Sequence, residues 1–483
     1  MDFKIIIFMQ KKIEQFKKDF LKELEEQNVA IFAGAGLSVA SGYVDWKGLL
    51  KDFANEVGLD VEKETDLISV VQYYLNSNDS NRHTLNEKIR NVFHHEKNPN
   101  ENHRILARLP ISTYWTTNYD RLIEASLEEA KKKVDAKYTK NHLATTLHGR
   151  DVILYKMHGD VEHPEDAILS KHQYEKYFQS HEGYVTALRG DLVSKTFLFI
   201  GFSFTDPNLD LILSRIRVMF EKNQRKHYCF FKEEELADGE DQNEYEYRKT
   251  KQALVINDLL RSNIHVLLVK KYSEITDILK EIEDRFKRKT IYISGSAHEY
   301  GSFTPEAAED FISNLSKELI KNSFKIVSGF GLGVGSSVIN GVLKEVYLEK
   351  KETLKDQLLL RPFPQGGEAE KNWESYREDM ISYAGASIFI FGNKKDGDTT
   401  ILAQGVRKEF EIAVKQNALV IPVGATGFMA KELWNEIAKD YKKYFVSEDH
   451  IDIFKKLGDE NLDPKKLIES IIEFLNKMAK NNT

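Results

Sequence analysis

Short apolar segments alternate with longer amphipathic segments along most of the chain, and this alternation is the strongest constraint on its fold. Strands connected by helices in this way form βα units around a mostly parallel sheet. The first series of expected strands covers 29–33, 111–116, 152–157, 195–200, 226–231 and 264–269. A second series covers 290–294, 324–328, 387–391 and 418–423. The sequence therefore predicts an α/β protein with two Rossmann-like parallel-sheet domains in tandem.

A basic helix end separates the two series. The amphipathic segment 273–287 ends in positively charged residues, which suit the C-terminal end of a helix. We place the domain boundary there, which gives domains 1–287 and 288–483. At roughly 150 residues per domain, the length of 483 residues suggests two or three domains, and the two series of strands favour two. Near the start, 11–26 is expected to be an amphipathic helix, and residues 1–9 an extended or frayed start without an assigned role.

Cys229 is the only cysteine of the chain. A single thiol excludes an intrachain disulfide and any structural zinc site that needs two or more cysteines, and it suits a reducing cytoplasm. The 69 basic and 76 acidic residues leave a formal net charge of −7, which argues against a broad nucleic-acid-binding face. No segment reaches the roughly 18 apolar residues that span a bilayer. We therefore expect no metal, no nucleic acid and no membrane as partners.

Polar or glycine-containing motifs follow four strands of the first series. Ligands of parallel α/β sheets bind beyond the carboxyl ends of the strands, so these motifs should converge on one edge. Each motif alone is also compatible with a tight turn, a helix cap or a structural histidine, whereas their convergence favours a nucleotide site. The motifs are Gly34-Ala35-Gly36-Leu37-Ser38, Thr117-Asn118-Tyr119-Asp120, His158-Gly159-Asp160 and Gly201-Phe202-Ser203-Phe204-Thr205-Asp206-Pro207.

These motifs, in this order, resemble those of the sirtuin-like domains over about residues 30–270. The resemblance implies an NAD site, with NAD as the substrate, in which Asn118 and His158 are catalytic. The further NAD contacts that it implies are Gly34, Ala35, Gly36, Ser38, Asp45, Ser203 and Asp206. Protein-deacylating sirtuins carry a four-cysteine zinc module, which a chain with Cys229 alone cannot form. The chain is therefore more similar to the zinc-free bacterial branch that cleaves NAD.

An asparagine and a histidine are sufficient for this chemistry. Breaking the nicotinamide–ribose bond passes through an oxocarbenium-like state, and nicotinamide leaves without a proton because its ring nitrogen is already cationic. A histidine, with an ordinary pKa of about 6.5, can act as base toward water or a ribose hydroxyl. Asn118 can hold the water or the ribose edge. We hypothesise NAD hydrolysis, and a zinc-free protein deacylase and a non-enzymatic NAD sensor remain the alternatives.

The second series carries a glycine-rich loop after its second strand. The loop, residues 329–335, joins an apolar strand to an apolar helix, and the backbone amides of such a loop can surround a phosphate. Gly295 and Ser296 follow the first strand of this series. Arg377 and Lys394 stand where an anion site needs cations. A flexible turn and solvated surface cations are the alternative interpretations.

This half, about residues 288–440, is similar to the SLOG family of Rossmann-like nucleotide-binding domains. The likeness rests on the Gly-Ser opening, the glycine-rich loop and Arg377-x-x-Met380. The catalytic branch of that family has a Pro-Gly-Gly-x-Gly-Thr-x-x-Glu motif after the third strand, whereas residues 392–398 read Gly-Asn-Lys-Lys-Asp-Gly-Asp here, which favours binding over catalysis. The signal-ligand contacts that the resemblance implies are Gly295, Ser296, Gly331, Gly333, Arg377, Lys394 and Glu409.

The tandem of a sirtuin-like domain and a SLOG domain resembles the effectors of the bacterial Thoeris anti-phage systems. The resemblance implies that a partner TIR-domain protein makes a cyclic ADP-ribose signal during infection and that the SLOG domain binds it. The sirtuin-like domain then depletes cellular NAD in an abortive infection. Because ligand switching of an enzyme commonly works through subunit rearrangement, we expect a homo-oligomer, and we expect it in the cytoplasm. Which cyclic ADP-ribose isomer is the signal stays open.

Overall fold

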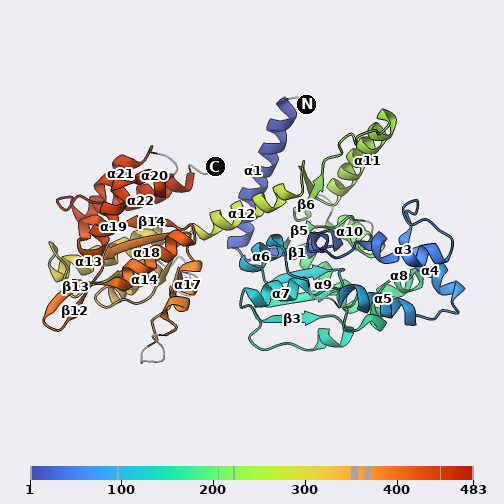
Figure 1. Ribbon diagram of the computed structural model, residues 1–483, viewed down its shortest axis with the longest axis horizontal. Coiled ribbons are helices and arrows are strands. Elements are labelled where there is room, and N and C mark those ends of the chain that lie inside the picture. Colours follow the sequence, from blue (N-terminus) through green and yellow to red (C-terminus); the bar gives the residue numbers. More distant parts are fainter. Residues whose placement is uncertain are drawn as a thin grey trace. The chain divides into compact units, whose positions relative to one another are not determined.

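The computed structural model describes residues 3–94, 97–204, 206–220, 223–349, 357–364, 371–445 and 448–480 (Figure 1). The chain divides into two compact units, Met1–Glu283 and Asp284–Thr483. Each unit has a parallel sheet of its own, which confirms the predicted α/β architecture with two sheets in tandem. In the described ranges, no helix combines the length and the apolar character needed to cross a membrane.

The first unit is built on a seven-stranded sheet of order β3-β4-β2-β1-β5-β6-β7, in which every neighbouring pair is parallel. Its strands are β1 (Val29–Ala33), β2 (Thr113–Thr116), β3 (Val134–Lys137), β4 (Val152–Lys156), β5 (Thr196–Ile200), β6 (His227–Lys232) and β7 (Ile264–Val269). All expected strands of the first series are present. β3 was not expected, because half of this short edge strand is charged and its apolar pattern is too weak to predict it.

The helices of the first unit connect these strands. They are α1 (Phe3–Glu25), α2 (Ala35–Val39), α3 (Trp46–Glu56), α4 (Leu67–Ser77), α5 (His83–Phe93), α6 (Glu101–Arg108), α7 (Leu122–Glu129), α8 (Lys171–Ser180), α9 (Glu182–Ser194), α10 (Pro207–Phe220), α11 (Gln242–Arg261) and α12 (Ser273–Lys287). The acidic stretch 232–251 includes the first half of α11, whose only buried residue is Leu259 among those described.

Helix α1 packs on the sheet through its aromatic residues. The Phe16 ring lies 4.7 Å from the Tyr228 ring and 5.7 Å from the Phe230 ring, centroid to centroid, on β6. The expectation of an extended or frayed start over residues 1–9 was wrong for the described part, since α1 begins at Phe3. Residues 3–9 contain no glycine or proline, so nothing in the sequence stops the helix from extending toward the N-terminus as far as Phe3.

A helical excursion lies between β1 and β2. Helices α3, α4 and α5 bury an apolar cluster of their own. It is centred on Leu50, Val70 and Ile89, which are fully buried. Because this cluster holds the three helices together, the excursion can present a firm wall beside the end of β1. Trp46 at the start of α3 contacts both this cluster and the core of the sheet.

The second unit has a five-stranded parallel sheet of order β10-β9-β8-β11-β14 and a separate antiparallel hairpin. The sheet strands are β8 (Thr290–Ser296), β9 (Lys325–Ser328), β10 (Leu358–Leu360), β11 (Ala386–Phe391) and β14 (Leu419–Pro422), and the hairpin strands are β12 (Asn393–Asp396) and β13 (Thr399–Leu402). β10 and the hairpin were not expected, and the hairpin occupies the place interpreted as a broken loop motif.

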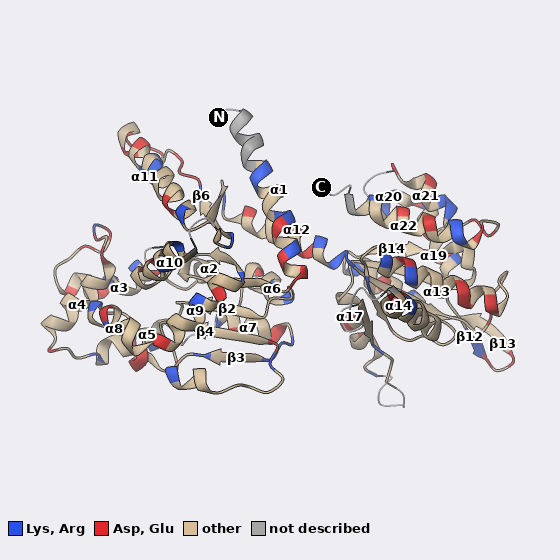
Figure 2. Ribbon diagram, turned by 180° about the vertical axis from the view of Figure 1, so that it is seen from behind, with Lys and Arg blue, Asp and Glu red and all other residues tan. Residues whose placement is uncertain are grey.

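Helices cover the second sheet and extend beyond it. They are α13 (Pro305–Lys321), α14 (Gly335–Glu349), α17 (Trp373–Ser382), α18 (Gln404–Lys415), α19 (Phe428–Lys439), α20 (Tyr441–Tyr444), α21 (Ile451–Lys456) and α22 (Pro464–Lys480). One continuous apolar core joins these helices to the sheet, and α21 and α22 contribute to it through Phe454 and Phe474. Figure 2 shows basic and acidic residues interspersed along the helices of both units.

Candidate functional site

The carboxyl ends of the central strands form the candidate site of the first unit. β1 lies between β2 and β5, and the strand order runs away from it on both sides. Such a switch point is where open α/β sheets bind ligands. Asn118 and His158 follow the neighbouring strands β2 and β4, while Ser38 and Asp206 follow the neighbouring strands β1 and β5. The structure therefore brings all four loops to one edge of one sheet.

Asn118 is held in place by the loop that follows β1. Its Nδ2 donates to the carbonyl oxygen of Gly34 at 3.0 Å and lies 3.1 Å from Ser38 Oγ. Ser38 Oγ donates in turn to Asp120 Oδ2 at 2.8 Å, and the backbone N–H of Asn118 donates to Thr116 Oγ1 at 3.0 Å. Asn118 is only 8% exposed. These bonds fix the orientation of its amide, as a group that positions a reacting molecule requires.

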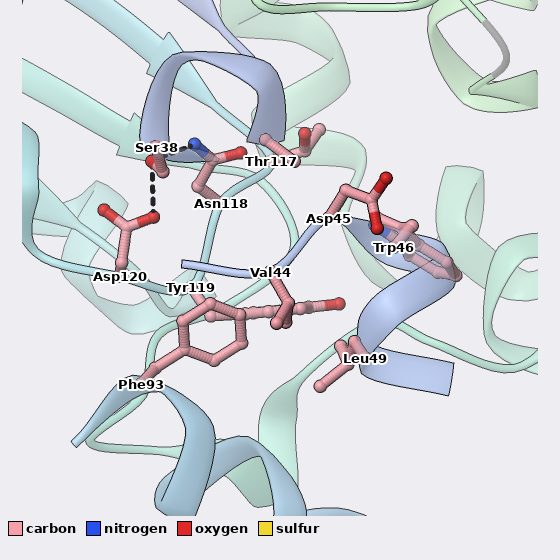
Figure 3. Close-up of a pocket in the computed structure, with 11 residues that line it drawn as sticks. Ser38, Val44, Asp45, Trp46, Leu49, Phe93, Thr117, Asn118, Tyr119 and Asp120 are labelled. Carbon is pink, nitrogen blue, oxygen red and sulfur yellow. Dashed lines mark hydrogen bonds between the residues drawn. The ribbon is translucent and has the colours of Figure 1, made fainter. Parts of the chain in front are cut away.

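A pocket lies beside this cluster (Figure 3). Asp45 lines it and also caps α3, because its Oδ1 accepts from the backbone N–H of Gly48 at 2.8 Å. A few polar groups that converge beside apolar walls are typical of small-molecule sites. The apolar wall comes largely from the helical excursion and the polar wall from the β1 and β2 loops. The lining residues are Ala35, Ser38, Val44, Asp45, Trp46, Leu49, Phe93, Thr117, Asn118, Tyr119 and Asp120.

His158 is held by a different set of residues. It is 1% exposed, its Nε2 lies 3.2 Å from Asp206 Oδ2, and its Nδ1 lies 3.4 Å from the Tyr174 hydroxyl. The approach to Asp206 is close, but the N–H direction at Nε2 does not meet hydrogen-bond geometry. Burial lowers the pKa of His158, and the Asp206 carboxylate opposes that shift. His158 is therefore a buried, neutral imidazole next to a carboxylate.

The glycines after β1 serve the packing of two loops. The backbone N–H groups of Gly34 and Gly36 donate to the carbonyl oxygens of Ile200 and Gly201, at 3.0 and 2.9 Å. A Cβ atom at Gly34 would lie 2.5 Å from Gly201 O, and one at Gly201 would lie 2.1 Å from Leu37 N. These glycines let the β1 and β5 loops touch, and two of the amides expected to face a phosphate are already hydrogen-bonded. Ala35 and Ser38 remain on the pocket wall.

The remaining expected contacts lie in the loop after β5. Ser203 is exposed, whereas the Asp206 side chain is 9% exposed and faces His158. Asp206 Oδ1 also accepts from the backbone N–H groups of Asn208 and Leu209, at 2.8 and 3.1 Å. Asp206 therefore caps α10 with one carboxylate oxygen and meets the histidine with the other.

A buried charge network under the site was not predicted from the sequence. Lys156, at the end of β4, is 0% exposed, and its Nζ donates to the carbonyl oxygen of Asp120 at 2.5 Å, to Glu124 Oε1 at 3.1 Å and to Asp160. Burial lowers the pKa of Lys156, but the nearby carboxylates outweigh it and raise the pKa. The network ties the Asn118 loop to the His158 loop. Its only sequence signal is a lysine inside an otherwise apolar strand.

The second unit presents a cation at the corresponding edge. Arg377 on α17 is 8% exposed, its Nε lies 3.4 Å from Glu409 Oε1, and its guanidinium lies 4.9 and 5.7 Å from the ring centroids of Phe363 and Trp373. Glu409 Oε2 also accepts from Ser294 Oγ at 2.6 Å. Burial raises the pKa of Glu409, while Ser294 and Arg377 oppose that shift. The structure thus brings together two of the expected contact residues, Arg377 and Glu409.

The glycine-rich loop of the second unit packs on the end of β8. A Cβ atom at Gly331 would lie 2.0 Å from Gly295 O, and Gly333 has a φ of +72° with Ala297 O at 2.1 Å from its Cβ position. Ser296 Oγ donates to the carbonyl oxygen of Asn393 at 3.0 Å, which anchors the hairpin. Asn393, at 0% exposure, was not predicted.

Lys394 stands apart from the buried pair. It lies on β12, opposite Ile401 of β13, and its side chain is exposed. The buried neighbour Asn393 accepts from the backbone N–H groups of His298 and Glu299, at 2.8 and 3.0 Å, which fixes the base of the hairpin. The hairpin therefore presents Lys394 to solvent from a fixed base.

Two family models match the chain. Residues 112–256 match a SIR2-like domain, and residues 274–478 match the Sir2- and TIR-associating SLOG family. These matches confirm the predicted order of a sirtuin-like domain and a SLOG domain. The glycine motif after β1 lies outside the first match, so only the hydrogen-bonded geometry connects it to the site.

Full-length relatives extend the likeness over nearly the whole chain. An NAD(+) hydrolase ThsA from Bacillus cereus (strain MSX-D12) is 54% identical over 465 residues, which cover 96% of this chain and 98% of the relative. The ThsA of Acinetobacter baumannii (strain 532279) is 48% identical, with 93% and 96% covered, and that of Cytobacillus dafuensis is 50% identical, with 95% of each covered. The chain therefore belongs to the family of the ThsA proteins, which are named NAD(+) hydrolases.

Proposed function

We propose that this chain is an NAD glycohydrolase, which splits NAD into nicotinamide and ADP-ribose in its first unit. The observation that carries the proposal is the match, along nearly the full length of each chain, to relatives named NAD(+) hydrolase. The geometry supports it, because the fixed amide of Asn118 and the neutral imidazole of His158 follow neighbouring strands at one sheet edge. Asp45, Ala35 and Ser38 line the pocket wall beside Asn118 and are the proposed NAD contacts.

In the proposed reaction, a water oxygen bonds to C1′ of the nicotinamide ribose. The bond from C1′ to the nicotinamide nitrogen breaks, and its electron pair neutralises the cationic ring. His158 accepts the proton that the water gives up and later releases it to solvent. The amide of Asn118 orients the ribose and the water. Burial keeps His158 neutral near pH 7, which is the state that a base requires.

The second unit is proposed to bind a cyclic ADP-ribose isomer that activates the first. The Arg377–Glu409 pair supports this role, because a ligand phosphate can replace the carboxylate as the partner of the guanidinium. A ligand shifts an enzyme toward its active state only if it binds that state more tightly. Gly295, Ser296, Gly331, Gly333 and Lys394 are proposed further contacts.

The proposed setting is anti-phage defence by NAD depletion. A partner protein with a TIR domain would supply the cyclic ADP-ribose signal, and the chain would act in the cytoplasm as a homo-oligomer. The family model of the second unit, which carries association with TIR in its name, supports the choice of partner.

Nicotinamide release from the purified full chain tests the proposal. NAD is added with and without each cyclic ADP-ribose isomer, and nicotinamide and ADP-ribose are separated and quantified. We expect release with at least one isomer and loss of release in His158→Ala, while exchange of an exposed histidine, His83→Ala, leaves it unchanged. NAD turnover that depends on an acyl-lysine peptide would instead identify a deacylase. NAD binding without release under every condition would identify a sensor.

A further inference from the structure

Asp206 uses its two carboxylate oxygens for two different purposes. Oδ1 accepts from the backbone N–H groups of Asn208 and Leu209 and so caps α10. Oδ2 lies 3.2 Å from His158 Nε2, with both side chains at least nine-tenths buried. A helix cap needs only one acceptor oxygen. The carboxylate therefore also faces His158, and it interacts with the Tyr174 hydroxyl as well.

We propose that Asp206 is a positioning residue that holds the His158 proton on Nε2 and leaves the lone pair of Nδ1 as the base. A carboxylate only accepts hydrogen bonds, so the ring nitrogen that faces it must carry the proton. The remaining nitrogen, Nδ1, then has a lone pair and lies 3.4 Å from the Tyr174 hydroxyl. That hydroxyl also hydrogen-bonds to the Asp206 carboxylate, so its one proton leaves the Nδ1 lone pair available. The inference rests on the proposed NAD hydrolysis and replaces the expected contact between Asp206 and NAD.

The surroundings of His158 support a single ring orientation. The Tyr174 and Tyr177 rings meet the imidazole edge-on, at centroid distances of 5.3 and 6.0 Å. The His158 carbonyl oxygen accepts from the backbone N–H of Ile168 at 2.9 Å, which fixes the loop. Catalytic hydrogen bonds are often poorly aligned before substrate binds and tighten in the complex, and the misaligned Nε2 contact fits this behaviour.

The cap makes Asp206→Asn a decisive substitution. The amides of Asn208 and Leu209 need an acceptor, so the carbonyl oxygen of the new side chain stays on the cap and its NH₂ group faces His158. Nε2 must then accept a hydrogen bond, which moves the ring proton to Nδ1. The helix keeps its cap, since asparagine and aspartate cap equally well. The histidine, however, loses the lone pair of the base.

The first measurement is steady-state NAD hydrolysis by the full chain with whichever cyclic ADP-ribose isomer activates the wild type. We expect Asp206→Asn to lower kcat by up to about 10⁴-fold, the loss that an amide in place of a tautomer-fixing carboxylate causes in a serine protease, with little change in KM for NAD. The matched control is Asp241→Asn, an exposed aspartate that caps α11 without facing a histidine, and it should keep the wild-type kcat. A raised KM with an unchanged kcat would overturn the inference in favour of an NAD contact.

The second measurement needs no activity. The ¹⁵N chemical shifts of labelled histidine distinguish a protonated ring nitrogen from a bare one, and His158→Ala identifies which signals belong to this residue. We expect a protonated Nε2 in the wild type and a protonated Nδ1 in Asp206→Asn. Identical shifts in the two proteins would overturn the inference, even if the chain released no nicotinamide at all. Absence of release alone would contradict only the proposed function.

Discussion

The two units present similar sheet edges with different chemistry. In the first unit, the amide of Asn118 is part of a network of neutral and acidic groups with Ser38 and Asp120. In the second unit, the edge is centred on the guanidinium of Arg377, which faces Glu409. A fixed amide network suits the orientation of a sugar and a water, whereas a paired cation suits an exchange of partners with a phosphate. The side chains at these edges, and not the sheets, separate the two roles.

The glycine-rich loops do not make this distinction. Gly34 in the first unit and Gly331 in the second both lie where a Cβ atom would strike the backbone of a neighbouring strand-end loop, at 2.5 and 2.0 Å. In both units the glycines let two loops touch, which brings the side chains beyond them together. A glycine pattern therefore indicates where a site is formed but not what the site does.

The largest expected effect is a loss of activity at the first edge alone. Asn118→Ala removes the amide that Gly34 and Ser38 hold in place, and we expect nicotinamide release to fall about 1000-fold, since a lost positioning donor of this kind costs on that order. Binding of the activating cyclic ADP-ribose isomer, measured by calorimetry, should stay unchanged. An equal loss of ligand binding would mean that the two edges are not separate sites.

Lys156→Met tests the charge network under the first edge. The substitution leaves the carboxylates of Glu124 and Asp160 buried without their cation, and breaking such a pair costs about 3 kcal/mol of unfolding free energy. Urea unfolding measures this change. Lys51→Met on the exposed face of α3 is the matched control and should shift the midpoint little. A loss no larger than the control's would contradict the structural role of the network.

Arg377→Lys tests the second edge with the charge retained. Lysine keeps the positive charge but loses the planar fork and the stacking on Phe363 and Trp373, so we expect ligand affinity to fall about 30-fold. NAD hydrolysis at saturating ligand should remain. Arg361→Lys, which changes another arginine that lies over an aromatic ring in the same unit, is the control and should leave the affinity unchanged. Equal losses in both variants would argue against a specific anion site.

The smallest expected effect is a difference between the two units in how their stability depends on pH. Burial lowers the pKa values of His103 and His227 in the first unit to about 3, whereas an unfolded histidine titrates near pH 6.5. The unfolded state therefore takes up protons first as the pH falls, and stability is lost below about pH 6.5, by about 1.4 kcal/mol per histidine at pH 5.5. The raised pKa of Glu409 in the second unit has the opposite effect on stability. Its contribution to the free energy of unfolding is lost as the pH rises.

Pulse proteolysis in urea at pH 7.5 and 5.5, with the fragments identified by mass spectrometry, follows each unit separately. We expect the first unit to lose more stability than the second on acidification. His103→Leu should flatten this pH dependence, and His83→Leu at an exposed site should not. Equal losses of stability in both units would contradict the attribution of the pH dependence to the buried histidines of the first unit.

The sheets and the convergence of the loops could be predicted, because buried parallel strands are short, continuous apolar runs. β3 and the β12–β13 hairpin could not, since their residues are charged or polar and their pairing depends on neighbours. The candidate residues after the strands could be named from their motifs. The hydrogen-bond partner of each residue could not be predicted, because partners can be far apart in the sequence. Ser38 and Asp120, for example, are separated by 82 positions.

The same limit applies to Asp206 and Lys156. Asp206 could be predicted as a helix cap, which is a local property, but its approach to His158 depends on the strand order, in which β2 and β1 lie between β4 and β5. Lys156 ends an otherwise apolar strand, and the sequence does not show which carboxylates would surround it. Local chemistry is visible in a sequence, whereas contacts across a sheet require the fold.

Cys229 gives the first unit a built-in chemical reporter. It is the only cysteine of the chain, it is 1% exposed on β6, and burial raises the pKa of its thiol. Thiol-alkylating reagents react with an exposed thiolate. In the folded sheet the Cys229 thiol is buried, so these reagents reach it only when the sheet opens. Each alkylated molecule then records a single event in which β6 separated from β5 or β7, and the labelling rate measures how often the sheet that carries the candidate site opens.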